Sequence, residues 1–160
     1  MVRQNGTSEV RVRVLVQAPP ERAFDLFTNG LGDWWMPEYT WSGPDCLGRI
    51  GIEPRAGGLC YEIGPYGFRM DWGRVLTWEP PRRLVLAWQI SPQRVPEPDP
   101  NRASEVDVVF TPDGAATGVE LTHRHFDRHG RADAEAYRGG MAVGWEQLLG
   151  RYAARVHRGR

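Results

Sequence analysis

Residues 72–90 constrain the fold of this chain more than any other segment. They contain two runs rich in valine, leucine and tryptophan, and a Pro80-Pro81 pair separates the two runs. Apolar runs on either side of a proline turn are typical of two adjacent antiparallel strands. The hairpin carries more indole surface than a small core needs. We therefore expect a sheet that forms the wall of a pocket, with Trp72 and Trp88 in the wall and Trp78 packed beside the turn.

The remaining segments predict further strands and two short helices. Residues 9–17 alternate apolar and charged side chains, which indicates a half-buried strand. Prolines and apolar spacing indicate two short helices after it, at residues 21–28 and 31–36. The other predicted strands span residues 49–54, 58–63, 68–78, 84–90, 105–111 and 118–125, and a turn at Pro112-Asp113-Gly114 joins the last two. Residues 91–104 contain four prolines, so we expect a long, mobile loop there.

The C-terminal segment predicts one long amphipathic helix that begins after Asp133. Its apolar residues recur at spacings of three and four and are Ala134, Tyr137, Met141, Trp145, Leu148, Tyr152 and Val156. Gly139, Gly140, Gly144 and Gly150 interrupt this helix, and each costs about 1 kcal/mol relative to alanine in a helix interior. The glycines indicate either close packing of the helix on the sheet or missing side chains that leave room for a cavity.

Together these elements predict a single α+β domain over residues 1–160. A curved antiparallel sheet of six to seven strands must have one face covered. Only the long C-terminal helix is amphipathic enough to cover it, so the sheet would wrap around this helix and leave a cup between them. The hydrophobic content of 41% and charged content of 25% are ordinary for a globular protein.

The composition excludes several classes of function. All 20 basic residues are arginine and they balance 20 acidic residues, so we expect no nucleic-acid partner. The absence of lysine excludes Schiff-base chemistry. No apolar run is long enough to span a membrane, and the first residues lack the apolar core of a secretory signal. We therefore expect a cytoplasmic protein with reduced thiols and no membrane partner.

Short motifs in a characteristic order extend over nearly the whole chain. They are Ala18-Pro19-Pro20-Glu21, Trp34-Trp35, Pro54-Arg55-Ala56-Gly57-Gly58, Trp72-Gly73-Arg74-Val75, Trp78-Glu79-Pro80-Pro81-Arg82-Arg83-Leu84, Trp88, Glu120-Leu121-Thr122-His123 and Gly144-Trp145. With these motifs the chain resembles the SRPBCC, START-related helix-grip superfamily. Within that superfamily it is similar to the family of activators of heat-shock-chaperone ATPase homologues (Aha-type).

The resemblance implies a helix-grip fold with a cavity for small hydrophobic ligands. It implies no particular catalytic residue, because the family shares no catalytic residue set. The family name comes from eukaryotic co-chaperones in which this fold is only one part. The resemblance therefore does not by itself imply chaperone activation for this chain.

Side-chain alternation predicts which residues face the C-terminal helix. The face of the last strand that carries His123 is expected to line the cup. Phe68 and Trp72 are expected to face the helix as well, and Arg74 would follow them unless a bulge at Gly73 shifts the register. The candidate ligand-binding residues are Phe27, Trp35, Trp72, Trp88, Phe110, His123, Tyr137, Met141 and Trp145.

His123 is the polar residue that could carry chemistry. Among apolar neighbours it could be a general base, an anchor for a polar ligand atom, or a core histidine bonded to a tyrosine or to the backbone. His125, Asp127 and His129 follow it and suggest a metal site, but three arginines in the same segment would repel a cation. We predict no metal and, without a GxGxxG motif, no cofactor.

Carboxylates and thiols are the other reactive groups. Glu62 and Asp71 lie within predicted strands and could divide acid and base roles, or they could simply pair with arginine. Cys60 is expected to be a buried structural thiol, whereas Cys46 is expected in a loop. Neither cysteine has a local base that would activate it.

Three functions follow from these observations. The first is binding of a small, largely apolar molecule, which could be aromatic, between the sheet and the C-terminal helix. The second is an enzyme, such as a cyclase, dehydratase or hydrolase, that acts on a hydrophobic metabolite with His123 as its base. The third is a co-chaperone-like or homodimeric interaction protein that uses the proline-rich loop.

Overall fold

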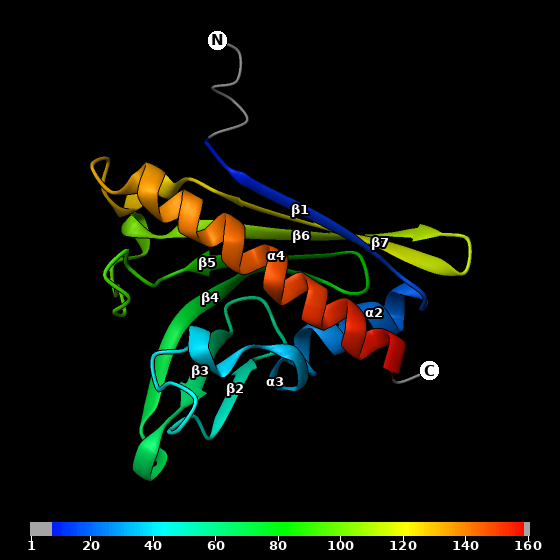
Figure 1. The fold of residues 1–160 in the computed structure, drawn as a ribbon, viewed down its shortest axis with the longest axis horizontal. Helices are drawn as coiled ribbons and strands as arrows, with labels where there is room; N and C mark the ends of the chain where they lie inside the picture. The colour runs from blue at the N-terminus through cyan, green and yellow to red at the C-terminus, as the bar shows by residue number, and fades with distance from the viewer. Residues whose placement is uncertain (1–7, 159–160) are drawn as a thin grey trace.

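The computed structural model describes residues 8–158, so the first residues considered above lie outside the described part. Seven antiparallel strands form one sheet in the order β1-β7-β6-β5-β4-β3-β2 (Figure 1). The strands are β1 (Val10–Val16), β2 (Arg49–Ile52), β3 (Leu59–Ile63), β4 (Arg69–Glu79), β5 (Arg83–Trp88), β6 (Ser104–Asp113) and β7 (Ala116–Arg124). The helices are α2 (Pro20–Thr28), α3 (Leu31–Trp34) and α4 (Ala134–Arg158), with 3₁₀ turns η1 (Pro37–Tyr39), η2 (Pro65–Gly67), η3 (Pro100–Arg102) and η4 (Phe126–His129). The predicted α+β helix-grip architecture is confirmed.

Helix α4 covers one face of the sheet but is fully buried only along its C-terminal half. Figure 1 shows α4 running diagonally across the sheet, with α2 and α3 beside its C-terminal end. Its buried residues are Trp145, Leu148, Leu149, Tyr152 and Val156. The Tyr152 hydroxyl donates to the Ala23 carbonyl oxygen at 2.7 Å, and the Tyr152 ring packs edge-on against Phe27. The core is therefore closed at this end, whereas residues 134–144 of α4 include no buried side chain.

A β-bulge at Trp72 and Gly73 decides the register of β4. The pairing with β3 shifts by one residue there, so that Trp72 is an additional residue on β4. Trp72 and Gly73 are both buried, Arg74 is exposed, and Val75 is buried again. A Cβ on Gly73 would lie 2.6 Å from the Ala87 carbonyl oxygen, so this close approach requires glycine. The bulge thus turns Arg74 away from the core.

Two expectations from the sequence are wrong. Phe68 precedes β4, is 55% exposed and packs against the ring of Trp41, so it does not face α4. The β6–β7 hairpin turns later than expected, because Pro112 and Asp113 still belong to β6. Gly114 adopts the positive φ of 63° that the tight turn needs. The long loop after β5 is present as expected, and its mobility stays a prediction.

Candidate functional site

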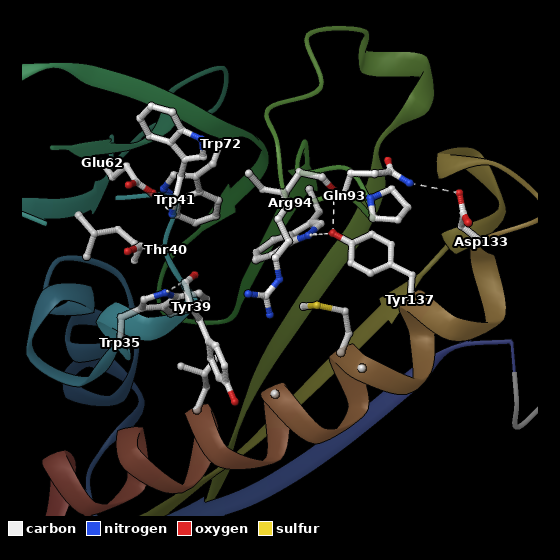
Figure 2. Close-up of a pocket in the computed structure, with 18 of the residues that line it drawn as sticks. Trp35, Tyr39, Thr40, Trp41, Glu62, Trp72, Gln93, Arg94, Asp133 and Tyr137 are labelled. Carbon is white, nitrogen blue, oxygen red and sulfur yellow. Dashed lines mark hydrogen bonds between the residues drawn. The ribbon is translucent and has the colours of Figure 1, made fainter. Parts of the chain in front are cut away.

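A cavity of about 470 Å³ lies between the N-terminal half of α4 and the β2–β5 side of the sheet. The segment after α3 and the loop after β5 form its other sides (Figure 2). The lining residues are Trp35, Tyr39, Thr40, Trp41, Ile50, Glu62, Trp72, Trp88, Ile90, Pro92, Gln93, Arg94, Asp133, Ala136, Tyr137, Gly140, Met141, Gly144 and Leu148. Pockets of this size hold small organic molecules.

Three tryptophans form an aromatic wall of the cavity, with Trp72 and Trp88 on the sheet and Trp35 in the segment after α3. The rings of Trp35 and Trp72 are stacked, with centroids 6.0 Å apart and planes 24° apart. Trp88 packs edge-on against Trp72, with centroids 5.4 Å apart. Indole faces and edges are good partners for flat rings, because aromatic groups prefer offset-stacked or edge-to-face contacts. The wall is therefore suited to a planar apolar ligand.

Two glycines of α4 face this wall across the cavity. A Cβ built on Gly140 would meet no other heavy atom of residues 8–158 within 4 Å, and one on Gly144 would meet only the Tyr39 ring, at 3.8 Å. The interpretation of these glycines as sites of close helix–sheet packing is therefore wrong. The alternative holds at Gly140 and Gly144, where missing side chains leave room for the cavity.

Gly150 lies in α4 outside the cavity, so a substitution there measures how much a glycine destabilises this helix. It is exposed, and a Cβ there would meet nothing within 4 Å in the described part of the chain. We expect Gly150→Ala to raise the free energy of unfolding by about 1 kcal/mol, because alanine is the better helix former. Urea unfolding monitored by circular dichroism checks this, and an unchanged or lower midpoint would contradict it.

Five of the nine candidate ligand-binding residues line the cavity. They are Trp35, Trp72, Trp88, Tyr137 and Met141. The expectation that the other four also line it is corrected, since Phe27, Phe110, His123 and Trp145 are buried in the core outside the lining. Phe27 and Phe110, for example, pack edge-on against each other between α2 and the sheet, with ring centroids 5.6 Å apart. Alternation identifies the inward face of a strand, but it does not say where along that face a cavity opens.

His123 belongs to a buried hydrogen-bonded chain. Trp145 Nε1 donates to His123 Nδ1 at 3.0 Å. Because an indole N–H can only donate, the proton of a neutral His123 lies on Nε2, which is 2.7 Å from Ser104 Oγ. Ser104 Oγ can then donate to His129 Nε2, also at 2.7 Å. His129 Nδ1 is buried and has no hydrogen-bond partner among residues 8–158.

This environment favours a structural role for His123. Its side chain is 0% exposed, and burial holds its pKa well below the usual value. Both ring nitrogens already have partners, and His123 does not line the cavity. The partners are a tryptophan and a serine, not the tyrosine or backbone group considered above. The geometry therefore gives no support to His123 as a base or as a ligand anchor.

The two candidate carboxylates, Glu62 and Asp71, lie on opposite faces of the sheet. Glu62 is buried beside the cavity and accepts hydrogen bonds from the Trp41 and Ser42 backbone nitrogens and from the Ser42 hydroxyl. Asp71 is exposed and pairs with Arg69 at 2.8 Å, so the two carboxylates do not form an acid–base pair. Burial raises the pKa of the Cys60 thiol, which makes it unreactive.

Sequence reasoning did not place six polar residues at the cavity, namely Tyr39, Thr40, Glu62, Gln93, Arg94 and Asp133. Glu62 could have been found, because it lies two residues from buried Cys60 and therefore on the same inward face of β3. Arg94 could not, because it lies in the loop after β5, where no periodicity indicates which way a side chain points.

Within residues 8–158, no three histidine, cysteine, aspartate or glutamate side chains come together as a metal site. No described helix combines the length and the apolar character needed to cross a membrane.

Comparisons with known proteins agree with the fold. The model of a family described as Activator of Hsp90 ATPase homolog 1-like protein matches residues 17–156. No curated protein matches the chain.

Several solved structures are similar over nearly the whole chain. The anthrahydroquino-gamma-pyrone synthase Txn09 is 34% identical, with 91% of this chain and 95% of that one covered and a TM-score of 0.62. The self-sacrificing resistance protein CalC from Micromonospora echinospora is 29% identical, with 95% and 96% covered and a TM-score of 0.65. Protein NE0264 from Nitrosomonas europaea is 15% identical, with 95% and 96% covered and a TM-score of 0.67, and it supports the fold alone.

Proposed function

The chain belongs to the Activator of Hsp90 ATPase homolog 1-like family, and we propose that this member binds a small, planar, largely apolar molecule in the cavity between α4 and the sheet. The family and its structural relatives support hydrophobic ligand binding or a cyclase-type role in general. The finer assignment, to a planar aromatic ligand, depends on the lining of this particular cavity.

The observation that carries the proposal is the pairing of the tryptophan wall with the glycines of α4. Trp35, Trp72 and Trp88 offer ring surfaces on one side, and Gly140 and Gly144 remove side chains on the other. A cavity bounded on one side by aromatic rings favours a flat ligand, because flat ligands bury the most surface against such a wall.

A titration with a neutral flat probe tests the proposal. We expect 2-(hydroxymethyl)anthraquinone to bind at one site with a dissociation constant of about 1–100 µM, the range typical of a well-buried ligand of this size. Isothermal titration calorimetry measures the affinity, and quenching of tryptophan fluorescence reports contact with the wall. The absence of both signals at the solubility limit of the probe would contradict the proposal.

A cyclase-type reaction is the second candidate function. The observation that favours it is the 34% identity to a protein described as a synthase, over 91% of this chain. The same cavity would then hold the substrate, but the base would not be His123. Incubation of the protein with a flexible polyketide-like substrate, followed by mass spectrometry, separates the two candidates. A binder returns the substrate unchanged, whereas an enzyme forms a ring-closed product.

The third function, a co-chaperone-like or homodimeric interaction protein, stays a prediction.

A further inference from the structure

The loop after β5 holds one arginine over the cavity in an unusual backbone conformation. The Arg94 backbone nitrogen donates to the Ser91 carbonyl oxygen at 2.8 Å, and the Ser91 nitrogen donates to the Val95 carbonyl oxygen at 2.8 Å. Arg94 has a φ of 66°, in the left-handed region that side chains other than those of glycine and asparagine rarely adopt. Such a conformation persists only where its surroundings impose it, and it is common at ligand sites.

Two contacts tie this loop to α4. Gln93 Nε2 lies 3.5 Å from Asp133 Oδ2, at the start of the helix. The Tyr137 hydroxyl donates to the Ile90 carbonyl oxygen at 2.6 Å and accepts from Trp88 Nε1 at 2.8 Å. Burial raises the pKa of Tyr137 to about 12, so its hydroxyl stays protonated and keeps donating to the loop. Hydrogen bonds within the loop and between the loop and α4 therefore hold Arg94 in position.

The Arg94 side chain points into the cavity and has no partner there. Figure 2 shows its guanidinium group reaching from the loop into the space above α4. It is the only cationic side chain of the described lining, and no hydrogen bond or ion pair joins it to residues 8–158. The acidic lining residues are engaged elsewhere, Glu62 with the Trp41–Ser42 backbone and Asp133 with Gln93. Arg94 is exposed, so its guanidinium donors are hydrated in the free protein and available to a ligand.

A second unused donor lies in the wall of the same cavity. Trp72 is 4% exposed, and its indole Nε1 is buried without a hydrogen-bond partner in the described part of the chain. A buried N–H without an acceptor is unfavourable and uncommon in folded proteins. Because the Nε1 atom has almost no accessible surface, a bound acceptor would reach it only when the Trp72 ring turns toward the cavity, and the hydrogen bond would then remove that penalty.

From these two unused donors we propose that the ligand is a planar aromatic acid. An acidic oxygen, such as a carboxylate, pairs with the Arg94 guanidinium at the loop side of the cavity. A neutral acceptor on the ring system, such as a carbonyl oxygen, takes the hydrogen bond of Trp72 Nε1. This inference rests on the proposed function and specifies its substrate class.

Three probes of similar shape test the two contacts separately. Anthraquinone-2-carboxylate carries both groups, 2-(hydroxymethyl)anthraquinone lacks the charge, and anthracene-2-carboxylate lacks the ring carbonyls. We expect the protein to bind the first probe about tenfold or more tightly than the second, because charge-assisted hydrogen bonds are the stronger kind. Arg94→Gln should reduce this preference to about twofold or less. Arg74→Gln is the matched control, since Arg74 is exposed on β4 outside the cavity, and it should leave the preference unchanged.

Trp72→Phe tests the second contact, because it keeps a ring in the wall and removes the donor. We expect it to weaken binding of anthraquinone-2-carboxylate about fivefold while leaving the affinity for anthracene-2-carboxylate nearly unchanged. An equal effect on both acids would overturn the role of Trp72 as a donor.

The outcomes distinguish this inference from the proposed function. Equal binding of the acid and the alcohol by the unmodified protein, or a preference that survives Arg94→Gln, would overturn the acid assignment and leave the binding function standing. If none of the three probes binds, the proposed function fails and the inference fails with it.

Discussion

Gly140→Leu is expected to weaken binding of 2-(hydroxymethyl)anthraquinone about 10- to 100-fold. A Cβ at this position points into open space of the cavity, with no heavy atom of residues 8–158 within 4 Å, so the leucine side chain would occupy ligand volume. Forcing extra methylene groups against a ligand or a core costs about 1–3 kcal/mol, which corresponds to this loss of affinity. Leucine is also the better helix former, so the variant should be at least as stable as the unmodified protein.

The matched control is Gly150→Leu, which makes the same substitution in the same helix outside the cavity. Gly150 is exposed and its environment is equally open, so stability should change in the same direction while binding stays within about twofold. Calorimetric titration of the three proteins measures the affinities. Unchanged binding by Gly140→Leu would show that the ligand does not enter this cavity.

The free energy of unfolding is expected to fall as the pH is lowered from 7.5 to 5. Burial lowers the pKa of His129 to about 4, and burial also lowers the pKa of His123. In the unfolded chain both histidines bind protons below a pH of about 6.5. Between the unfolded and the folded pKa values the unfolded state therefore binds more protons than the folded state, and acid favours unfolding. His129 alone contributes a loss of about 1–2 kcal/mol at pH 5, with allowance for screening by nearby solvent.

Urea unfolding at pH 7.5, 6 and 5 measures this dependence. His129→Gln keeps an acceptor for Ser104 but does not titrate in this range, so the variant should lose less stability on acidification than the unmodified protein.

His125→Asn is the control, because His125 is outside the buried hydrogen-bonded chain and has a φ of 67°, which asparagine tolerates. Asp107 does not interfere with this measurement. Burial alone would raise the pKa of Asp107, but its hydrogen bonds with Arg83 and Arg124 outweigh burial and lower the pKa. The effect of Asp107 on stability therefore falls below this pH range. A stability that is flat from pH 7.5 to 5 would contradict the buried, neutral state of the histidines.

The secondary structure was largely predictable because it depends on local patterns. The alternation along β1 and the three-and-four spacing of α4 are each set by which side chains must be buried. The errors occurred where a single residue decides the geometry. Gly114, with its positive φ, makes the turn between β6 and β7 after Asp113. The register of β4 was open at Gly73, and the close approach of the Ala87 carbonyl oxygen decides it.

The candidate site was predictable only in part. Trp72 and Trp88 were correctly placed in the wall because the hairpin pattern puts them on one face of the sheet. The chain from Trp145 through His123 and Ser104 to His129 was not predictable, since its members come from four separate segments and no spacing links them.

The sequence by itself determined an antiparallel sheet wrapped around a long helix, the tryptophan-rich wall and the glycines that break α4, because periodicity and composition are properties of neighbouring residues. Only the tertiary structure decided which inward-facing residues fill the core and which border empty space. That depends on how far α4 stands from the sheet, and so on the sum of the side-chain volumes between them. The tertiary structure alone also brings Arg94 and Trp72 to one cavity with unused donors, because long-range contacts position the loop after β5.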